Sequence, residues 1–134
     1  MDKNLEVRLV KNRKELDNVM KIREIVFIRE QKVPKGLEAD GLDKLSKHVI
    51  VFYKNKPIGC ARIRIIGKKA KLERIALLKG YRGRGFGNAI VNYLIKYCKS
   101  RKFKNIFMNS SIISWAFMAG SALSRLESLL WKPA

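Results

Sequence analysis

The sequence has no long apolar run and few cysteines, and each of these absences excludes a class of protein. No stretch of about 18 uncharged apolar residues occurs, so no membrane-spanning helix is predicted. The first six residues contain no apolar signal core, so we expect no secretion and a cytoplasmic location. The two cysteines, Cys60 and Cys98, lie far apart in apolar segments, which predicts reduced, buried thiols rather than a disulfide.

Acidic residues are also scarce, because 11 Asp and Glu face 30 Lys and Arg, giving a formal charge of +19. Such an excess is typical of proteins that bind nucleic acid, and also of enzymes with a polyanionic ligand. The basic residues are spread along the chain, and no motif of paired stacking aromatics is present. Nucleic-acid binding is therefore kept only as an alternative.

The hydrophobic pattern predicts one α+β domain over residues 1–134. A hydrophobic fraction of 47% excludes a disordered chain. Period-2 and period-3.6 patterns predict strands at 5–10, 48–53, 58–66, 71–78 and 104–108, and helices at 13–30, after a glycine-rich loop, and at 112–131. This order indicates a three-layer arrangement, with a mixed, mostly antiparallel sheet flanked by helices.

The glycine-rich loop before the second helix is the most informative segment. Gly83, Gly85 and Gly87 allow positive φ angles and close approach of a ligand to the backbone amides. The helix that begins here exposes unpaired N–H groups, which predicts a phosphate-binding loop. Arg82 and Arg84 add two guanidinium groups suited to a pyrophosphate. The spacing fits neither a P-loop nor a Rossmann motif, and a basic turn that only caps the helix is the alternative.

Two blocks of the sequence resemble the GNAT family of N-acetyltransferases. Arg82-x-x-Gly85-x-Gly87 resembles that family's glycine motif, and its flanks look like the usual lead-in. Residues 22–34, followed by Glu38 and Asp40-Gly41, resemble the first helix and loop of a small single-domain branch. The resemblance covers residues 5–109. It implies a GNAT-like acyl-CoA N-acyltransferase fold, in which the strand at 71–78 and the strand at 104–108 splay apart around acetyl-CoA.

The resemblance implies acetyl-CoA as co-substrate, a primary amine as acceptor, and no metal. The backbone of Ile75, Ala76 and Leu77 is expected to pair with the pantetheine arm, and the Leu77 amide to polarise the thioester carbonyl. The cofactor candidates in the loop are Arg82, Gly83, Arg84, Gly85, Phe86, Gly87 and Asn88, whose amides would hold the pyrophosphate. Asn109, at the end of the next strand, completes the set.

Glu73 is the candidate general base, because it lies in an otherwise apolar strand just before the cofactor-contacting residues. A half-buried carboxylate there is expected to have a pKa raised toward neutrality. The alternative is that Glu73 pairs with Arg62 or Arg64 of the adjacent strand and only holds the sheet. Arg74 is expected to point to the opposite face. His48, the only histidine, is a second candidate base or a structural residue.

Direct attack by the amine needs no covalent enzyme intermediate, so neither cysteine is predicted to be a nucleophile. By resemblance, the end of the first helix lines the acceptor pocket, or else it is a solvated helix end; its residues are Arg29, Glu30 and Gln31. The acidic residues Glu38, Asp40 and Asp43 are expected to form a mouth for a cationic acceptor. Without such a mouth, the positive chain disfavours polycationic acceptors.

The resemblance ends at Asn109, and residues 110–134 are predicted to form an atypical helix. The family continues with a helix whose Tyr protonates the leaving thiolate, and then with a β-hairpin, but no Tyr follows Tyr97 here. We hypothesise a truncated end or a shifted reading frame, which sequencing of the source gene would test. If the ending is native, the general acid is unassigned, and an open sheet edge favours a homodimer or strand exchange. A catalytically weak acetyl-CoA-binding relative is then the alternative function.

Overall fold

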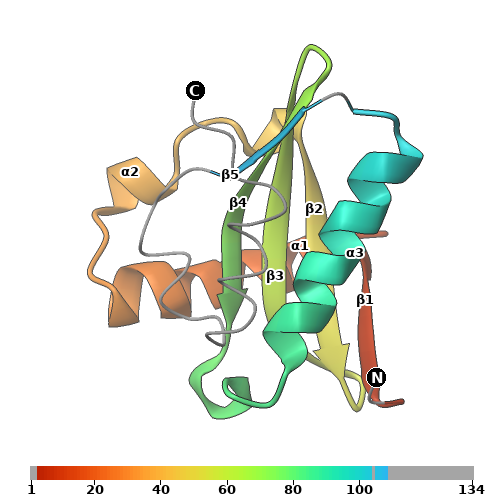
Figure 1. Cartoon of the computed structure of the whole chain (residues 1–134). Helices are drawn as coiled ribbons and strands as arrows, with labels where there is room; N and C mark the ends of the chain where they lie inside the picture. The colour runs from red at the N-terminus through yellow and green to blue at the C-terminus, as the bar shows by residue number, and fades with distance from the viewer. Residues whose placement is uncertain (1–2, 104, 109–134) are drawn as a thin grey trace.

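A computed structural model describes residues 3–103 and 105–108 of the chain, and in this part a five-stranded sheet lies between two layers of helix (Figure 1). The strands are β1 (Leu5–Leu9), β2 (Ser46–Tyr53), β3 (Lys56–Ile66), β4 (Lys69–Leu77) and β5 (Asn105–Met108). They lie side by side in sequence order. The first four pair antiparallel and β5 pairs parallel to β4, so the sheet is mixed and mostly antiparallel, as predicted.

Short turns set the register of the central meander. Lys54 and Asn55 join β2 to β3, and both have positive φ, at +50° and +67°. This conformation matches the right-handed twist of a two-residue hairpin. Gly67, at φ +61°, begins the turn between β3 and β4. The turns bring the three long strands into one antiparallel ladder.

The helical segments are α1 (Arg13–Arg23), η1 (Glu24–Glu30), α2 (Lys35–Glu38), η2 (Asp43–Leu45), η3 (Lys79–Tyr81) and α3 (Phe86–Ser100). Asn12 caps α1, because its side-chain oxygen accepts from the Glu15 N–H at 2.9 Å. The helix predicted over 13–30 is confirmed in extent, but η1 is π-helical, and the Gln31 N–H donates to the Val26 carbonyl five residues back.

The two faces of the sheet carry separate apolar cores, one under α3 and one under α1 (Figure 1). On the α3 side, Ile90 and Leu94 pack with Ile63 and Leu72 of the sheet. On the α1 side, the core consists of Val19, Ile22, Val26, Phe27, Ile50, Cys60 and Ala76. Strand alternation produces both cores, since neighbouring residues of a strand face opposite layers.

A β-bulge interrupts the ladder between β3 and β4. Cys60 lies opposite Ala76, but Arg62 lies opposite Glu73, so Arg74 and Ile75 together face one residue of β3. Arg74 has a φ of +53°, which is uncommon for a residue with a side chain. The bulge re-aims Arg74 into the same side-chain cluster as Glu73. The expectation that Arg74 points to the opposite face is therefore wrong.

The predicted order of elements is confirmed from β1 to β5. The helix predicted over 112–131 lies outside the described residues. Among the residues that the structure describes, no helix is long and apolar enough to cross a membrane.

Candidate active site

The outer edge of β4 is the first part of the site. In the described part of the chain, pairing between β4 and β5 ends at Leu72, whereas β4 continues to Leu77. On the inner edge, the Leu78 N–H donates to the Ile58 carbonyl of β3 at 2.8 Å. Successive backbone N–H groups of a strand point to opposite edges. The Leu77 N–H therefore points away from β3, to the outer edge of β4 on the side where β5 pairs. Residues 75–77 thus present backbone amides along the outer edge of β4, beyond the pairs with β5 that the described residues form.

The glycine-rich loop follows directly and ends at the start of α3. Gly83 and Gly85 have φ angles of +77° and +83°, which are favourable only for glycine. A Cβ built at either position would meet nothing within 4 Å, so the space beside the loop is open. A hollow of about 310 Å³ lies here, between Leu5 and the first turn of α3. Among the described residues no side chain caps α3, so its first amides face this loop.

Arg82 holds the loop to two other parts of the molecule. Its Nε donates to the Leu77 carbonyl at 2.9 Å, and its Nη1 and Nη2 donate to the Glu30 carboxylate at 3.0 and 2.9 Å. The guanidinium predicted to bind pyrophosphate is thus bonded within the protein. Glu30, at the end of η1, is thereby fixed against the loop.

The side chain of Arg84 is also engaged within the protein. Its guanidinium lies over the rings of Tyr53 and Phe86, at 4.9 and 5.0 Å from their centroids. Its Nη2 donates to the Tyr53 hydroxyl at 3.2 Å. Both guanidiniums predicted to bind a pyrophosphate are thus engaged within the protein, and their contact with a cofactor stays a prediction.

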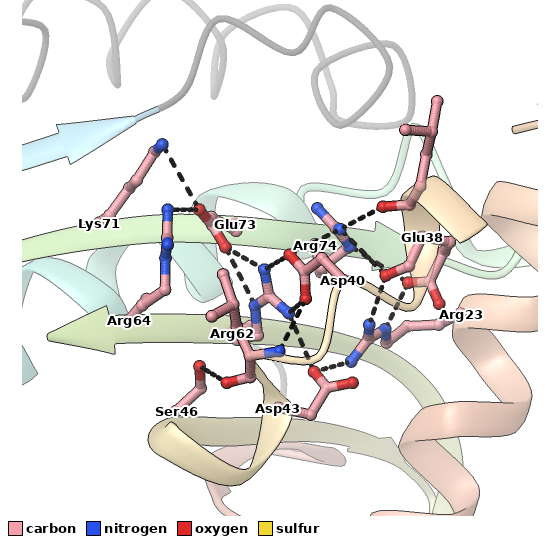
Figure 2. Close-up of polar contacts among 12 residues, drawn as sticks. Arg23, Glu38, Asp40, Asp43, Ser46, Arg62, Arg64, Lys71, Glu73 and Arg74 are labelled. Carbon is pink, nitrogen blue, oxygen red and sulfur yellow. Dashed lines mark hydrogen bonds and ion pairs between the residues drawn. The ribbon is translucent and has the colours of Figure 1, made fainter. Parts of the chain in front are cut away.

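A dense group of charged side chains lies on the α1 side of β3 and β4 (Figure 2). We call it the ion cluster; its members are Arg23, Glu38, Asp40, Asp43, Arg62, Arg64, Lys71, Glu73 and Arg74. Arg62 is at its centre and only 1% exposed, and it donates to Asp40, Asp43 and Glu73. Arg23, equally buried, donates to Glu38 and Asp43 at 2.7 Å each. A buried guanidinium is stable only with such partners.

Glu73 is paired with three cations. Its Oε2 accepts from Arg62, and its Oε1 accepts from Arg64 at 3.0 Å and lies 3.6 Å from the Lys71 ammonium. Burial alone would raise the pKa of Glu73, but the Arg62 hydrogen bond and the three positive charges outweigh it, so the pKa is lowered. The expectation of a raised pKa is wrong for this reason. These contacts fit the alternative in which Glu73 pairs with Arg62 and Arg64 and holds the sheet together. The role of Glu73 as a base stays a prediction.

The acidic loop, predicted to form the mouth of the acceptor site, has its carboxylates hydrogen-bonded to arginines of the ion cluster. Each of its carboxylates accepts from two guanidiniums: Glu38 from Arg23 and Arg74, Asp40 from Arg62 and Arg74, and Asp43 from Arg23 and Arg62. The Arg62 hydrogen bonds lower the pKa of Asp40 far below its usual value. The His48 ring, through Nε2, lies 2.9 Å from the Asp43 carbonyl, and so also holds this loop.

Both cysteines are buried thiols with raised pKa values. Burial raises the pKa of Cys60 to about 12 and that of Cys98 to about 11, so neither is a thiolate at neutral pH. Among the described residues, no group of His, Cys, Asp and Glu side chains could hold a metal ion. Asn109, predicted to contact the cofactor, lies outside the described residues.

Sequence reasoning missed the buried roles of Arg23 and Arg62. Arg23 recurs with the apolar residues of α1 at helical spacing, which could have indicated a buried position. A buried cation needs a carboxylate partner, and the acidic residues at 38, 40 and 43 were the available signal. The two arginines hold the acidic loop against the sheet.

Comparison with known proteins gives the family. Residues 16–119 match the model of the acetyltransferase (GNAT) family. A Bacillus subtilis protein named uncharacterized N-acetyltransferase YjcF is 40% identical over 88 residues, which cover 66% of this chain and 63% of that protein.

Solved structures share the fold. An acyl-CoA N-acyltransferase from Pseudomonas aeruginosa superposes with a TM-score of 0.69 at 19% identity, over 78% of this chain and 76% of that one. A GNAT family acetyltransferase from Elizabethkingia anophelis, solved with acetyl-CoA bound, gives 0.64 at 16% identity, over 86% and 72%. These structures share the fold, and the family match over residues 16–119 shows that the chain belongs to the GNAT family.

Proposed function

We propose that this protein transfers the acetyl group of acetyl-CoA to a primary amine by direct attack. The observation that carries the proposal is the outer edge of β4 at residues 75–77, which leads directly into the glycine loop at the start of α3. A thioester lying along residues 75–77 would meet backbone amides, and a pyrophosphate would meet the first turn of α3.

The residues of the edge and loop fit the two ends of such a co-substrate. Ile75, Ala76 and Leu77 would bind the pantetheine arm through their backbone, with the Leu77 N–H donating to the thioester carbonyl as negative charge develops there. The amides of residues 82–88 would hold the pyrophosphate, and the open space beside Gly83 and Gly85 supports this. Asn109 is proposed as a further contact.

Direct attack is favoured because both thiols are protonated and buried. The nitrogen lone pair of the neutral amine attacks the thioester carbonyl carbon, a C–N bond forms, and the C–S bond breaks. The sulfur leaves as the thiolate of CoA, and the amine proton passes to water or to a protein base. Glu73 is the candidate for that base, although its ion pairs favour a role in holding the sheet.

The proposal is tested by binding and turnover. Calorimetry with acetyl-CoA should give a saturable Kd, and amide spectra of residues 82–88 should shift on titration. Release of CoA thiol should then depend on added amine. Binding without amine-dependent thiol release would favour the alternative, a catalytically weak relative. If millimolar acetyl-CoA leaves the spectra unchanged, the proposal fails, and binding of single-stranded RNA becomes the next measurement.

A further inference from the structure

We propose that Glu30 is a positioning residue for acetyl transfer, and that it acts through Arg82 to set the spacing between the Leu77 amide and the glycine loop. The inference rests on the proposed function, because it concerns the two ends of the acetyl-CoA site. It is carried by a series of hydrogen bonds that runs from η1 through one guanidinium to the outer edge of β4.

The backbone of Leu77 presents its N–H and its carbonyl on the same edge of β4. Leu77 lies opposite Gly59 of β3. The next residue, Leu78, donates its N–H to the Ile58 carbonyl at 2.8 Å, so Leu77 belongs to a pair that exchanges no backbone hydrogen bonds. Both backbone groups of Leu77 therefore point to the outer edge. The Arg82 Nε bonds the carbonyl there, next to the amide proposed to polarise the thioester.

The side chain of Arg82 closes the segment that joins this amide to the glycine loop. The segment contains η3, and its turn is held by a backbone hydrogen bond from the Tyr81 N–H to the Leu78 carbonyl at 3.0 Å. The bond from Arg82 back to the Leu77 carbonyl ties the two ends of the segment together at 2.9 Å. A co-substrate with a thioester at one end and a pyrophosphate at the other binds best when the distance between its two sites is fixed in advance.

The carboxylate of Glu30 holds the tip of the Arg82 side chain. Nη1 and Nη2 donate to its two oxygens at 3.0 and 2.9 Å, and such a bidentate pair fixes the guanidinium plane. Without this partner, a long arginine side chain would lose more conformational entropy to stay on the carbonyl. The Arg82 and Glu30 side chains are 18% and 26% exposed, and ion pairs near the surface contribute little to folding stability. The pair thus orients the loop more than it stabilises the domain.

The variant Glu30→Gln tests the inference, because charge and positioning predict opposite results. It gains one unit of positive charge beside the glycine loop and releases Arg82 from its carboxylate, so electrostatic attraction alone would tighten binding of acetyl-CoA. If Glu30 positions the loop, calorimetry should instead show a Kd for acetyl-CoA about tenfold higher, as for one lost charge-assisted hydrogen bond. The kcat for CoA thiol release at saturating acetyl-CoA should also fall. The Kd for ADP, which occupies only the pyrophosphate end, should stay the same or decrease.

Two further variants separate positioning from charge. Glu24→Gln is the matched control, because it removes the same charge from η1, where Glu24 pairs with the exposed Arg29 at 3.4 Å, and it should bind acetyl-CoA like the wild type. Arg82→Lys keeps the positive charge but lacks the planar fork that bonds a carbonyl and a carboxylate together, so it should raise the Kd as Glu30→Gln does. Because the two residues act as one link, the double variant should bind no more weakly than either single variant.

The outcomes that contradict the inference differ from those that contradict the proposed function. Wild-type affinity and kcat in Glu30→Gln, or tighter binding of acetyl-CoA, would overturn the inference and leave the acetyltransferase function intact. Equal losses of affinity for acetyl-CoA and ADP, or additive losses in the double variant, would overturn it as well, because they indicate a general distortion of the loop. A wild-type protein that binds no acetyl-CoA would contradict the proposed function itself, and the inference with it.

Discussion

Arg62 and Asp40 are joined by two parallel hydrogen bonds, from Nη1 to Oδ1 at 2.9 Å and from Nη2 to Oδ2 at 2.7 Å. The arginine is on the central strand β3 and the aspartate is on the loop after α2, so the pair fixes the loop against the sheet. Bidentate pairs of this kind fix orientation as well as distance. The loop therefore has a defined place beside β4 before any ligand binds.

Replacing Arg62 by methionine should destabilise the fold strongly. The substitution leaves Glu73, Asp40 and Asp43 with one buried counterion fewer, and breaking a buried pair typically costs about 3–5 kcal/mol. Urea unfolding followed by circular dichroism measures the loss. The matched control is Arg13→Met, whose pair with Asp17 is exposed and should contribute less than about 1 kcal/mol. Equal losses in the two variants would contradict the central role of Arg62.

Replacing Glu73 by glutamine separates its two predicted roles. A structural Glu73 predicts a stability loss of about 1–3 kcal/mol, because charge-assisted hydrogen bonds to Arg62 and Arg64 weaken. It also predicts an unchanged pH profile of kcat/KM between pH 5 and 8, because the lowered pKa leaves Glu73 ionised throughout that range. If the acid limb of the profile disappears in the variant, Glu73 is the base after all.

Stability should fall in acid through the same cluster. Asp40, Asp43 and Glu73 have lowered pKa values in the folded protein, and return to about 4 when the chain unfolds. Their contribution is complete above the unfolded values and is lost as the pH falls through the folded ones. The urea midpoint should therefore change little from pH 7 to about 5 and drop below about 4. Asp40→Asn should flatten that drop, and a decline confined to pH 7–5 would point to other groups.

Replacing Gly85 by alanine tests the glycine loop. The φ of +83° disfavours any Cβ, so we expect a loss of roughly 1–2 kcal/mol even though the space is open. Any relaxation of this strain would turn the amides at the start of α3, and the Kd for acetyl-CoA should rise. Gly36→Ala is the control, because Gly36 lies in α2 without a positive φ and should gain about 0.4–1 kcal/mol. Unchanged acetyl-CoA affinity in Gly85→Ala would argue against the loop as the pyrophosphate site.

Replacing Gly59 by alanine tests the β4 edge from its inner side. A Cβ at this position would lie 2.8 Å from the Ala76 carbonyl oxygen and 2.9 Å from Leu77 Cδ2, so β4 must shift. Overpacking of this kind typically costs about 1–3 kcal/mol. Because the shifted residues are the proposed contacts of the pantetheine arm, calorimetry should show weaker acetyl-CoA binding. A destabilised variant with wild-type affinity would indicate that the edge does not bind the co-substrate.

The order of strands and helices could be predicted because each element has one clear period. In the strands β2 to β4, apolar and polar residues alternate or the residues are continuously apolar. In α1 and α3 the apolar residues recur at helical spacing. The glycine loop was also predictable, since positive φ at Gly83 and Gly85 follows from residue type. These are local properties of the chain.

The rest of the site depends on contacts between distant residues, which periodicity does not report. The sequence pattern of β4 gives no indication of the bulge at Arg74. Because of the bulge, the Arg74 side chain lies on the opposite face from the one predicted. The pKa of Glu73 was predicted in the wrong direction because three cations from β3 and β4 outweigh its burial. The acidic loop was predicted to be free to bind a cationic acceptor. Its ion-pair partners are Arg23, Arg62 and Arg74, which are distant in the sequence, so the pattern did not reveal them.

The thiol of Cys60 lies beneath the bulge and donates to the Arg74 carbonyl at 3.4 Å. Since it is fully buried and protonated, an alkylating reagent can reach it only when β3 and β4 separate locally. Its modification rate would then follow how often that part of the ladder opens. The alkylation rate of Cys60 would therefore measure local opening of the β3–β4 ladder, beside the residues proposed to bind the thioester.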